Sequence, residues 1–303
     1  MAKKIAPTPK ARSAMGASLY VPTTHKDLLK IANGELLETS RSLIFCTEDA
    51  VSEKDLSYAL FNLSVALENM RTVSVCDRFV RVRSPEVLQR VLAMKGSEHL
   101  SGFVLPKITY TNFNLYFDLL KQTQHRLMPT LETLEVFDDD EMQQLRKRLQ
   151  APQVRGRILA LRIGGNDLLS LLGMRRPRNA TLYSTPLGIV IARLVTIFKP
   201  YGFDLTAPVF EYLDLPELLE QELRQDLHHG LIGKTAIHPS QIAQIERHYR
   251  VKQNELATAK AILDESSPAV FKMHEAMCEV ATHKAWAERT IAQAEIFGMH
   301  ALE

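Results

Sequence analysis

Three carboxylates stand where short apolar runs of the sequence end, and their positions could hold a divalent cation. Glu48 closes the second of these runs and Glu132 the fifth, while Asp167 follows the sixth across Gly164, Gly165 and an asparagine. Magnesium takes one or two protein carboxylates together with water and ligand oxygens. A glycine pair at such a place lets the backbone approach a ligand closely. If the run ends meet in space, these residues predict a magnesium site.

Cationic side chains occupy similar places in other runs and would hold an anionic substrate beside the metal. Arg81 lies within the third run, Lys107 ends the fourth and His238 ends the eighth. Each has a plainer alternative. Arg81 could pair with a structural carboxylate, Lys107 could simply be solvated, and His238 could bond to the backbone before Pro239.

The apolar runs have the length and β-branched content of strands, and helical patterns separate them. Strands that alternate with helices form parallel βαβ units. Eight such units suit an α/β protein with a (β/α)8 TIM barrel, in which catalytic groups gather at the carboxyl ends of the strands. A doubly wound sheet would need a glycine-rich turn after the first strand, and "YVPTTHKD" has none. The expected strands span 18–22, 42–48, 78–84, 101–107, 125–133, 157–165, 202–210 and 230–238, and the clearest helices span 54–70, 84–96 and 137–150.

The composition of the chain changes along its length and predicts three parts. Residues 1–14 are basic and rich in small residues, which is typical of a flexible tail. Residues 15–250 hold all the expected strands and form the barrel catalytic domain. Residues 251–303 form a C-terminal helical extension, with helical patterns at 253–264 and 268–297 and no strand pattern.

The stretch "GLIGKTAIHPSQI" at 230–242 superficially resembles a phosphate-binding P-loop. That motif requires a glycine where this chain has His228, and its Gly-Lys-Thr must open a helix. Here Pro239 follows Lys234 closely, and the residue before a proline avoids helical geometry. The segment is therefore predicted to be a strand followed by a helix, and nucleotide hydrolysis is excluded.

The overall composition excludes several classes of protein. The formal net charge is +2 and no stripe of basic residues interleaved with aromatics occurs, which argues against nucleic-acid binding. No apolar run is long enough to cross a bilayer. Three cysteines without paired spacing suit a reducing cytoplasm and argue against disulfides or a zinc site. Cys46 has no histidine near it in the sequence that would activate it as a nucleophile.

Several of these stretches also carry a family resemblance. They are "TEDAV" (47–51), "VRV" (80–82), "LPK" (105–107) with "LET" (131–133), and "GKTAIHPSQI" (233–242). On these motifs the chain resembles the citrate lyase beta subunit group of the HpcH/HpaI aldolase superfamily. The resemblance implies a Mg2+-dependent (β/α)8 carbon–carbon lyase, assembled as a homotrimer or homohexamer. Its substrate would be a small anionic keto acid or an acyl thioester such as a coenzyme A ester.

The resemblance also implies roles for individual residues. By motif match, Glu132 and Asp167 would bind the metal, and Arg81 would face a substrate carboxylate or the developing enolate oxygen. Glu48 and Asp49 would form the acidic pair beside the metal, and Glu48 is the nearest candidate for the base that takes the hydroxyl proton. Metal and arginine would then stabilise the enolate that carbon–carbon cleavage leaves behind.

This chain departs from the family pattern at several positions. Two extra arginines and a missing aspartate predict a more anionic or differently shaped substrate, and they leave coenzyme A open. The departures are Thr23 for a glycine, Cys46-Thr47 for Asp-Leu, Arg83 for an asparagine, Arg162 for an apolar residue, and Ala207 for an aspartate.

Two other functions remain compatible with the sequence. The same site could hydrolyse a malyl- or citramalyl-type thioester, which would yield a free hydroxy acid. A barrel that has lost catalysis could instead serve as a binding or scaffold protein. Retention of Glu132, Asp167 and Arg81 argues against the scaffold, whereas Ala207 argues for it.

Overall fold

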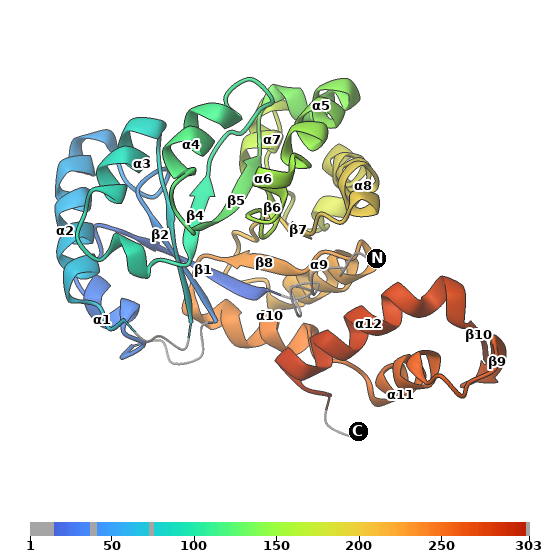
Figure 1. The fold of residues 1–303 in the computed structure, drawn as a ribbon. Helices are drawn as coiled ribbons and strands as arrows, with labels where there is room; N and C mark the ends of the chain where they lie inside the picture. The colour runs from blue at the N-terminus through green and yellow to red at the C-terminus, as the bar shows by residue number, and fades with distance from the viewer. Residues whose placement is uncertain (1–14, 37–40, 73–75, 301–303) are drawn as a thin grey trace, which may run out of the picture.

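The computed structural model describes residues 15–36, 41–72 and 76–300, in which the chain forms a parallel β-barrel surrounded by helices (Figure 1). The predicted basic tail at residues 1–14 lies outside the described residues. Among the described residues, no helix is both long and apolar enough to cross a membrane.

All eight expected strands are present, and each runs parallel to its neighbours in the order β7-β6-β5-β4-β3-β2-β1-β8. The sheet closes between β7 and β8, where Ala207 N–H donates to the Gly233 carbonyl at 2.7 Å and Ile232 N–H to the Leu205 carbonyl at 2.9 Å. The (β/α)8 prediction is therefore confirmed. The strands are β1 (Gly16–Pro22), β2 (Ser42–Cys46), β3 (Asp77–Arg81), β4 (Gly102–Leu105), β5 (Arg126–Leu131), β6 (Leu161–Ile163), β7 (Leu205–Thr206) and β8 (Gly233–Ala236).

The helices around the barrel begin where the sequence supplies capping groups. Ser84 Oγ accepts from Val87 N–H at the start of α3, and Asp138 accepts from two backbone N–H groups at the start of α5. Such caps satisfy donors that the first turn leaves free. The helices are α1 (Leu28–Ala32), α2 (Leu56–Asn69), α3 (Pro85–Leu92), α4 (Phe113–Leu120), α5 (Asp139–Leu149), α6 (Pro152–Arg155), α7 (Gly165–Leu171), α8 (Pro186–Phe198), α9 (Pro216–His228) and α10 (Ile242–His248).

Alternation along the strands separates two faces of the barrel. One set of side chains points outward and packs with the helices in a single large apolar core. The other set fills the lumen with Ile44, Phe79, Val104, Met128 and Leu159. This packed apolar layer closes the lumen. Above it, at the carboxyl ends of the strands, polar residues line an opening, which is called the mouth of the barrel below.

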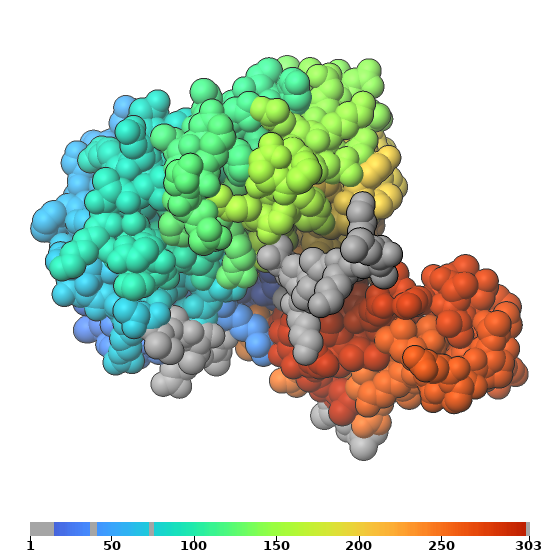
Figure 2. Space-filling view, viewed as in Figure 1, coloured from blue at the N-terminus to red at the C-terminus, as the bar shows by residue number. Residues whose placement is uncertain are grey.

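The C-terminal extension projects from one side of the barrel as a separate lobe (Figures 1 and 2). It contains α11 (Gln253–Leu263), the antiparallel hairpin β9 (Val270–Met273) and β10 (Ala276–Glu279), and the long α12 (Val280–Phe297). The helical content is as predicted, but the expectation of helix from residue 268 is wrong for the hairpin. His274 and Glu275 both take positive φ, at 48° and 59°, which is the backbone of a tight two-residue turn.

Candidate active site

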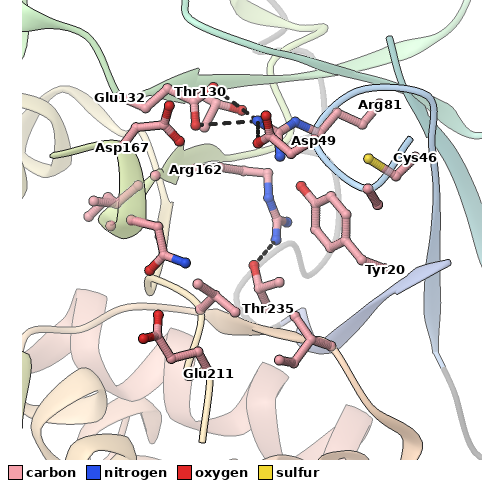
Figure 3. Close-up of a pocket in the computed structure, with 17 residues that line it drawn as sticks. Tyr20, Cys46, Asp49, Arg81, Thr130, Glu132, Arg162, Asp167, Glu211 and Thr235 are labelled. Carbon is pink, nitrogen blue, oxygen red and sulfur yellow. Dashed lines mark hydrogen bonds and ion pairs between the residues drawn. The ribbon is translucent and has the colours of Figure 1, made fainter. Parts of the chain in front are cut away.

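The carboxyl ends of five strands bring the predicted charged residues together at one mouth of the barrel (Figure 3). Arg81 ends β3, and Glu132 directly follows β5. Glu48 and Asp49 lie in the loop after β2, Lys107 lies in the loop after β4, and Asp167 lies in the first turn of α7, which follows β6. This is the edge at which catalytic groups of such barrels lie.

Arg81 is the centre of this group. Its Nη2 lies 2.6 Å from Glu48 Oε2, 3.1 Å from Asp49 Oδ2 and 3.3 Å from Glu132 Oε1. Burial alone would lower the pKa of Arg81, but the Tyr20 hydroxyl and the three carboxylates outweigh burial and raise it. The guanidinium therefore stays charged and fixed at the mouth.

Lys107 supplies a second cation from the loop after β4. It takes a left-handed backbone conformation with φ 51°, which side chains rarely adopt. In this conformation its N–H donates to Glu132 Oε1 at 2.9 Å, while its Nζ lies 3.2 Å from Glu48 Oε1 and 3.1 Å from Asp167 Oδ1. Strained backbone of this kind clusters at functional sites. Burial lowers the pKa of Lys107, yet the Glu48 and Asp167 carboxylates outweigh it and raise the pKa.

Glu132 is the most deeply buried carboxylate of the mouth, with 3% of its surface exposed. Burial and the nearby Asp167 carboxylate outweigh the downward pull of Arg81, and together they raise the pKa of Glu132 to about 7. The positive charge of Arg81 therefore does not fully offset the cost of burying this carboxylate. The site therefore favours the arrival of another cation.

The two glycines before Asp167 have clear packing reasons. A Cβ on Gly164 would lie 2.2 Å from Glu132 Oε2, and one on Gly165 would lie 2.7 Å from Pro208 Cβ. Gly164 thus leaves the space that the Glu132 carboxylate occupies. Both glycines also line the cavity described below, so their predicted approach to a ligand stays a prediction.

Glu48 and Asp49 have environments that push their pKa values apart. Burial raises the pKa of Glu48 against the pull of Arg81. Burial also acts upward on Asp49, but Arg81 and the hydrogen bond with Glu48 outweigh it and lower that pKa. Neighbouring carboxylates split in this way are suited to different tasks, one taking up a proton and the other staying charged.

A cavity of about 310 Å³ opens beside these residues (Figure 3). Among the predicted residues, its walls include Asp49, Arg81, Glu132 and Asp167 together with the two glycines. Several other lining residues are not among the predicted site residues, although two of them stand out in the sequence as departures from the family pattern. They are Tyr20, Thr130, Glu211 and Thr235, with the departures Cys46 and Arg162. Burial raises the pKa of the Cys46 thiol, which agrees with its rejection as a nucleophile.

One signal could have found the overlooked residues. Positions two apart on a barrel strand face the same side. Thr130 is two residues before Glu132, Arg162 is two before Gly164, and Thr235 faces the lumen from β8. Counting back from each predicted strand-end residue would therefore have identified Thr130 and Arg162.

Three residues singled out in the sequence lie elsewhere. His238 does not line the cavity; its Nδ1 contacts the Ser240 Oγ at 2.8 Å and accepts from the Ser240 N–H at 3.2 Å, which is the backbone-holding alternative. Arg83 donates to the carbonyls of Glu48 and Val51 and so fixes a loop. Ala207 packs in the outer core between sheet and helices. Its identity therefore says little about loss of catalysis.

The donor set fits a magnesium ion that keeps part of its shell from other sources. Among the described residues, no three His, Cys, Asp or Glu side chains converge to hold a metal by themselves. Glu132 and Asp167 do face one cavity and interact closely enough for Asp167 to raise the pKa of Glu132. Two carboxylates with water and substrate oxygens are a usual magnesium environment.

The fold and the charged mouth define a TIM-barrel enzyme with its chemistry at the strand ends. A family model for carbon–carbon bond lyases of the TIM-barrel fold matches residues 9–299. The chain therefore belongs to this carbon–carbon bond lyase family. This match confirms the resemblance drawn from the sequence, and it makes the protein an enzyme of the lyase class.

Several solved structures share the fold at low sequence identity. CitE from Mycobacterium tuberculosis, in complex with magnesium, acetoacetate and coenzyme A, has a TM-score of 0.69 at 20% identity, covering 94% of this chain and 99% of that chain. Malate synthase from Haloferax volcanii gives 0.64 at 13% identity, with 77% and 72% covered. RipC from Yersinia pestis gives 0.61 at 19% identity, with 81% and 99% covered. A comparison with curated protein sequences finds no significant match.

Proposed function

We propose that the protein is a Mg2+-dependent lyase that cleaves or forms the carbon–carbon bond of a 2-hydroxy acid or β-hydroxyacyl compound through an enolate. The observation that carries the proposal is the mouth of the barrel, where Arg81 lies within 3.3 Å of three carboxylates and Lys107 pairs with Asp167. The M. tuberculosis CitE structures with magnesium and pyruvate, acetoacetate or oxaloacetate support it.

Glu132 and Asp167 would hold the metal. When bound there, magnesium would act as a Lewis acid beside the carbonyl oxygen on which negative charge develops. Its charge would also hold Glu132 deprotonated at neutral pH, against the burial that raises the pKa of this carboxyl. Lys107 Nζ contacts both Asp167 and Glu48 and partly neutralises their charge at the outer side of the mouth.

The chain's own residues account for the proton and for the developing charge. The bond to be broken joins a hydroxyl-bearing carbon to a carbon next to a carbonyl. Glu48, whose pKa burial raises, accepts the hydroxyl proton as that carbon becomes a carbonyl. The bonding electron pair passes into the enolate, and Arg81 donates hydrogen bonds to the enolate oxygen or an adjacent carboxylate. Transfer of the proton from Glu48 to the enolate carbon completes the two products and restores the carboxylate of Glu48.

The substrate is an anionic keto acid or its hydroxy precursor, either free or as an acyl thioester. A cavity of about 310 Å³ lies at the small end of ligand pockets, so it accommodates the reacting acid. A thioester carrier such as coenzyme A would extend outside this cavity. Coenzyme A is a suitable probe, since one M. tuberculosis CitE structure contains it.

We further propose that the chain assembles as a homotrimer or homohexamer. The lobe of α11, α12 and the hairpin exposes Val270, Met277 and Trp286. Exposed apolar side chains on one lobe are typical of surfaces that meet a partner. Light scattering combined with size-exclusion chromatography would measure the mass, and a monomer at micromolar concentration would contradict this proposal.

The first experiment is calorimetric titration with pyruvate and oxaloacetate, each with and without Mg2+. We expect keto acid binding that depends on Mg2+ in the wild type and is lost in Glu132→Gln and Asp167→Asn. Asp139→Asn, which changes an exposed carboxylate paired with Arg193 on the outside of the barrel, serves as the matched control. Binding independent of Mg2+, or binding retained in both site variants, would overturn the metal assignment.

Product analysis then separates lyase from thioesterase chemistry. Hydroxyacyl thioesters and free 2-hydroxy acids would be incubated with the protein and Mg2+, and the products resolved by mass spectrometry. Two carbon fragments indicate the proposed lyase. A free hydroxy acid of unchanged carbon number indicates hydrolysis at the same site, and the lyase proposal would then fail.

A further inference from the structure

Arg162 is a buried guanidinium at the mouth that the proposed reaction does not use. It occupies the middle of β6, is 2% exposed and lines the cavity. One Nη donates to Thr235 Oγ1 at 2.5 Å and the other lies 3.8 Å from the Met128 sulfur. Its guanidinium carbon is 5.5 Å from the centre of the Tyr20 ring. All these partners are neutral.

Carboxylates near the cavity do not supply the missing charge. Within the described residues, no Asp or Glu oxygen lies in ion-pair range of Arg162. The carboxylates that line the cavity are each paired with another cation: Asp49 and Glu132 with Arg81, Asp167 with Lys107, and Glu211 with Arg175. A buried cation is unfavourable unless it is paired. Arg162 can therefore pair with an anion that binds in the cavity.

Hydroxyl groups beside Arg162 are also unsatisfied. Thr130 and Thr206 are in register with Arg162 on the two neighbouring strands. The Oγ1 atoms of both are buried without a hydrogen-bond partner among the described residues, and Thr130 lines the cavity. Buried hydroxyls are usually paired, so an unpaired one facing a cavity points to a ligand. This observation is independent of the charge of Arg162.

We propose that Arg162, with Thr130 and Thr235, binds a second anionic group of the substrate, remote from the bond that breaks. The group is a carboxylate or a phosphate, because a guanidinium fork with flanking hydroxyls matches either. The inference rests on the proposed function, which places the reacting end of the substrate at Arg81. The substrate is then at least a dianion.

The spacing of the two arginines suits a small molecule. The Arg81 guanidinium carbon lies 5.8 Å from the centre of the Tyr20 ring, and that of Arg162 lies 5.5 Å from the same centre. In Figure 3 the two side chains enter the cavity from its upper wall with Tyr20 beside them. Arg81, Arg162 and Tyr20 all line the same cavity of about 310 Å³, so one small substrate can contact both arginines.

The test compares ligands that differ only in the second anionic group. Oxaloacetate and 2-oxobutanoate have the same carbon number, with a carboxylate in one where the other has a methyl group. Phosphonopyruvate provides the phosphate-like arm. Their affinities with Mg2+ would be measured for the wild type, Arg162→Met, Arg162→Lys and Thr130→Val. Arg193→Met, on the outer surface of α8, is the matched control.

We expect the wild type to prefer one dianion over 2-oxobutanoate by about 10- to 100-fold, the range for a hydrogen bond to a charged group. Arg162→Met should abolish this preference without changing the affinity for 2-oxobutanoate. Arg162→Lys and Thr130→Val should each keep part of the preference for the dianion, and Arg193→Met should keep all of it. Preference for oxaloacetate assigns a carboxylate, and preference for phosphonopyruvate assigns a phosphate.

Two results overturn the assignment. One is a wild type that binds the dianions and 2-oxobutanoate equally. The other is a preference that survives in Arg162→Met, with thermal unfolding showing that this variant is folded. Failure of the proposed function has a different signature: keto acid binding would not require Mg2+ or Glu132, yet the dianion preference would still depend on Arg162.

Discussion

Two groups of buried charges in this barrel use similar residues for different ends. The mouth cluster consists of Glu48, Asp49, Arg81, Lys107, Glu132 and Asp167. The outer cluster lies between β8 and the helices outside it, and consists of Arg176, Glu222, Asp226 and Lys234. In the outer cluster Lys234 Nζ lies 2.9 Å from Glu222 and 3.0 Å from Asp226, while Arg176 pairs with Glu222.

The difference between the clusters is their charge balance. The outer cluster matches two cations with two carboxylates, and its side chains have essentially no solvent exposure. At the mouth two cations, Arg81 and Lys107, are shared among four carboxylates, and a cavity adjoins them. A closed, balanced set stabilises the fold, whereas an acid-rich set beside a cavity leaves a place for a cation. Charge balance thus separates a structural cluster from a site.

Lys234→Met would break the outer cluster and should give the largest effect on stability. It leaves Asp226 buried without a cationic partner, while Glu222 keeps Arg176, and this costs about 3–5 kcal/mol. Urea unfolding would measure the loss. Lys107→Met is the control, because Lys107 is about half exposed (48%) and its loss should cost far less. Equal losses would contradict the distinction between the clusters.

Arg81→Lys tests the role of the mouth cluster in catalysis, through its effect on kcat/KM. A lysine keeps the charge but loses the fork that contacts three carboxylates and the developing oxyanion. We expect kcat/KM to fall about 100- to 1,000-fold, as when an oxyanion donor is removed, with a small change in urea midpoint. A tenfold or smaller effect on kcat/KM would mean that Arg81 is structural.

Glu132→Gln tests the mouth cluster through the pH dependence of stability in the metal-free protein. Folding raises the pKa of Glu132 from 4.5 to about 7, so the folded protein binds this proton more tightly than the unfolded chain. The favourable contribution of Glu132 to the free energy of unfolding is complete below about pH 4.5 and is lost as the pH rises through 7. Relative to wild type, the variant should therefore gain as much as about 3 kcal/mol in unfolding free energy between pH 4.5 and pH 8.

The measurement is urea unfolding at both pH values in the presence of a chelator. A difference between variant and wild type that does not change with pH would refute the raised pKa. Saturating Mg2+ at pH 8 should stabilise the wild type but not Glu132→Gln, because only the carboxylate form binds the metal.

Lys107→Gly should have the smallest effect on stability and in the opposite direction. Glycine adopts the left-handed conformation at φ 51° without strain, which relieves about 1 kcal/mol. The variant should unfold at a slightly higher urea concentration yet lose keto acid affinity, because Nζ no longer contacts Glu48 and Asp167. Lys121→Gly, which changes an exposed lysine at the end of α4 where φ is −51°, should only destabilise.

Much of the fold could be predicted from sequence because the strands and helices alternate with strong apolar patterning. The lengths of the strands could not be predicted, because the apolar runs of the sequence continue beyond the residues that are hydrogen-bonded in the sheet. The expected strand 202–210 contains only Leu205–Thr206 as β7. The hairpin at 270–279 was missed because its turn is His274-Glu275, without the glycine or asparagine that usually marks such turns.

At the site, strand ends could be predicted but side-chain direction could not. Placing Glu48, Arg81 and Glu132 together needed only the rule that parallel strands end at one edge. Ala207 and Lys234 both face outward. Their direction depends on where the strand begins, because a shift of one residue turns every side chain to the other face of the sheet. Sequence motifs therefore gave Ala207 a significance that its place in the outer core removes.

The closure of the barrel has a consequence for motion. Because β7 has two residues, few backbone hydrogen bonds join β6 to β8 across it. Amide protons at this seam should exchange with solvent sooner than those of the longer strands β1 to β5. Arg162 lies on one side of the seam and Lys234 on the other. A transient opening there would disturb the ligand cavity and the outer cluster together, so ligand binding should slow exchange at Ala207 and Ile232.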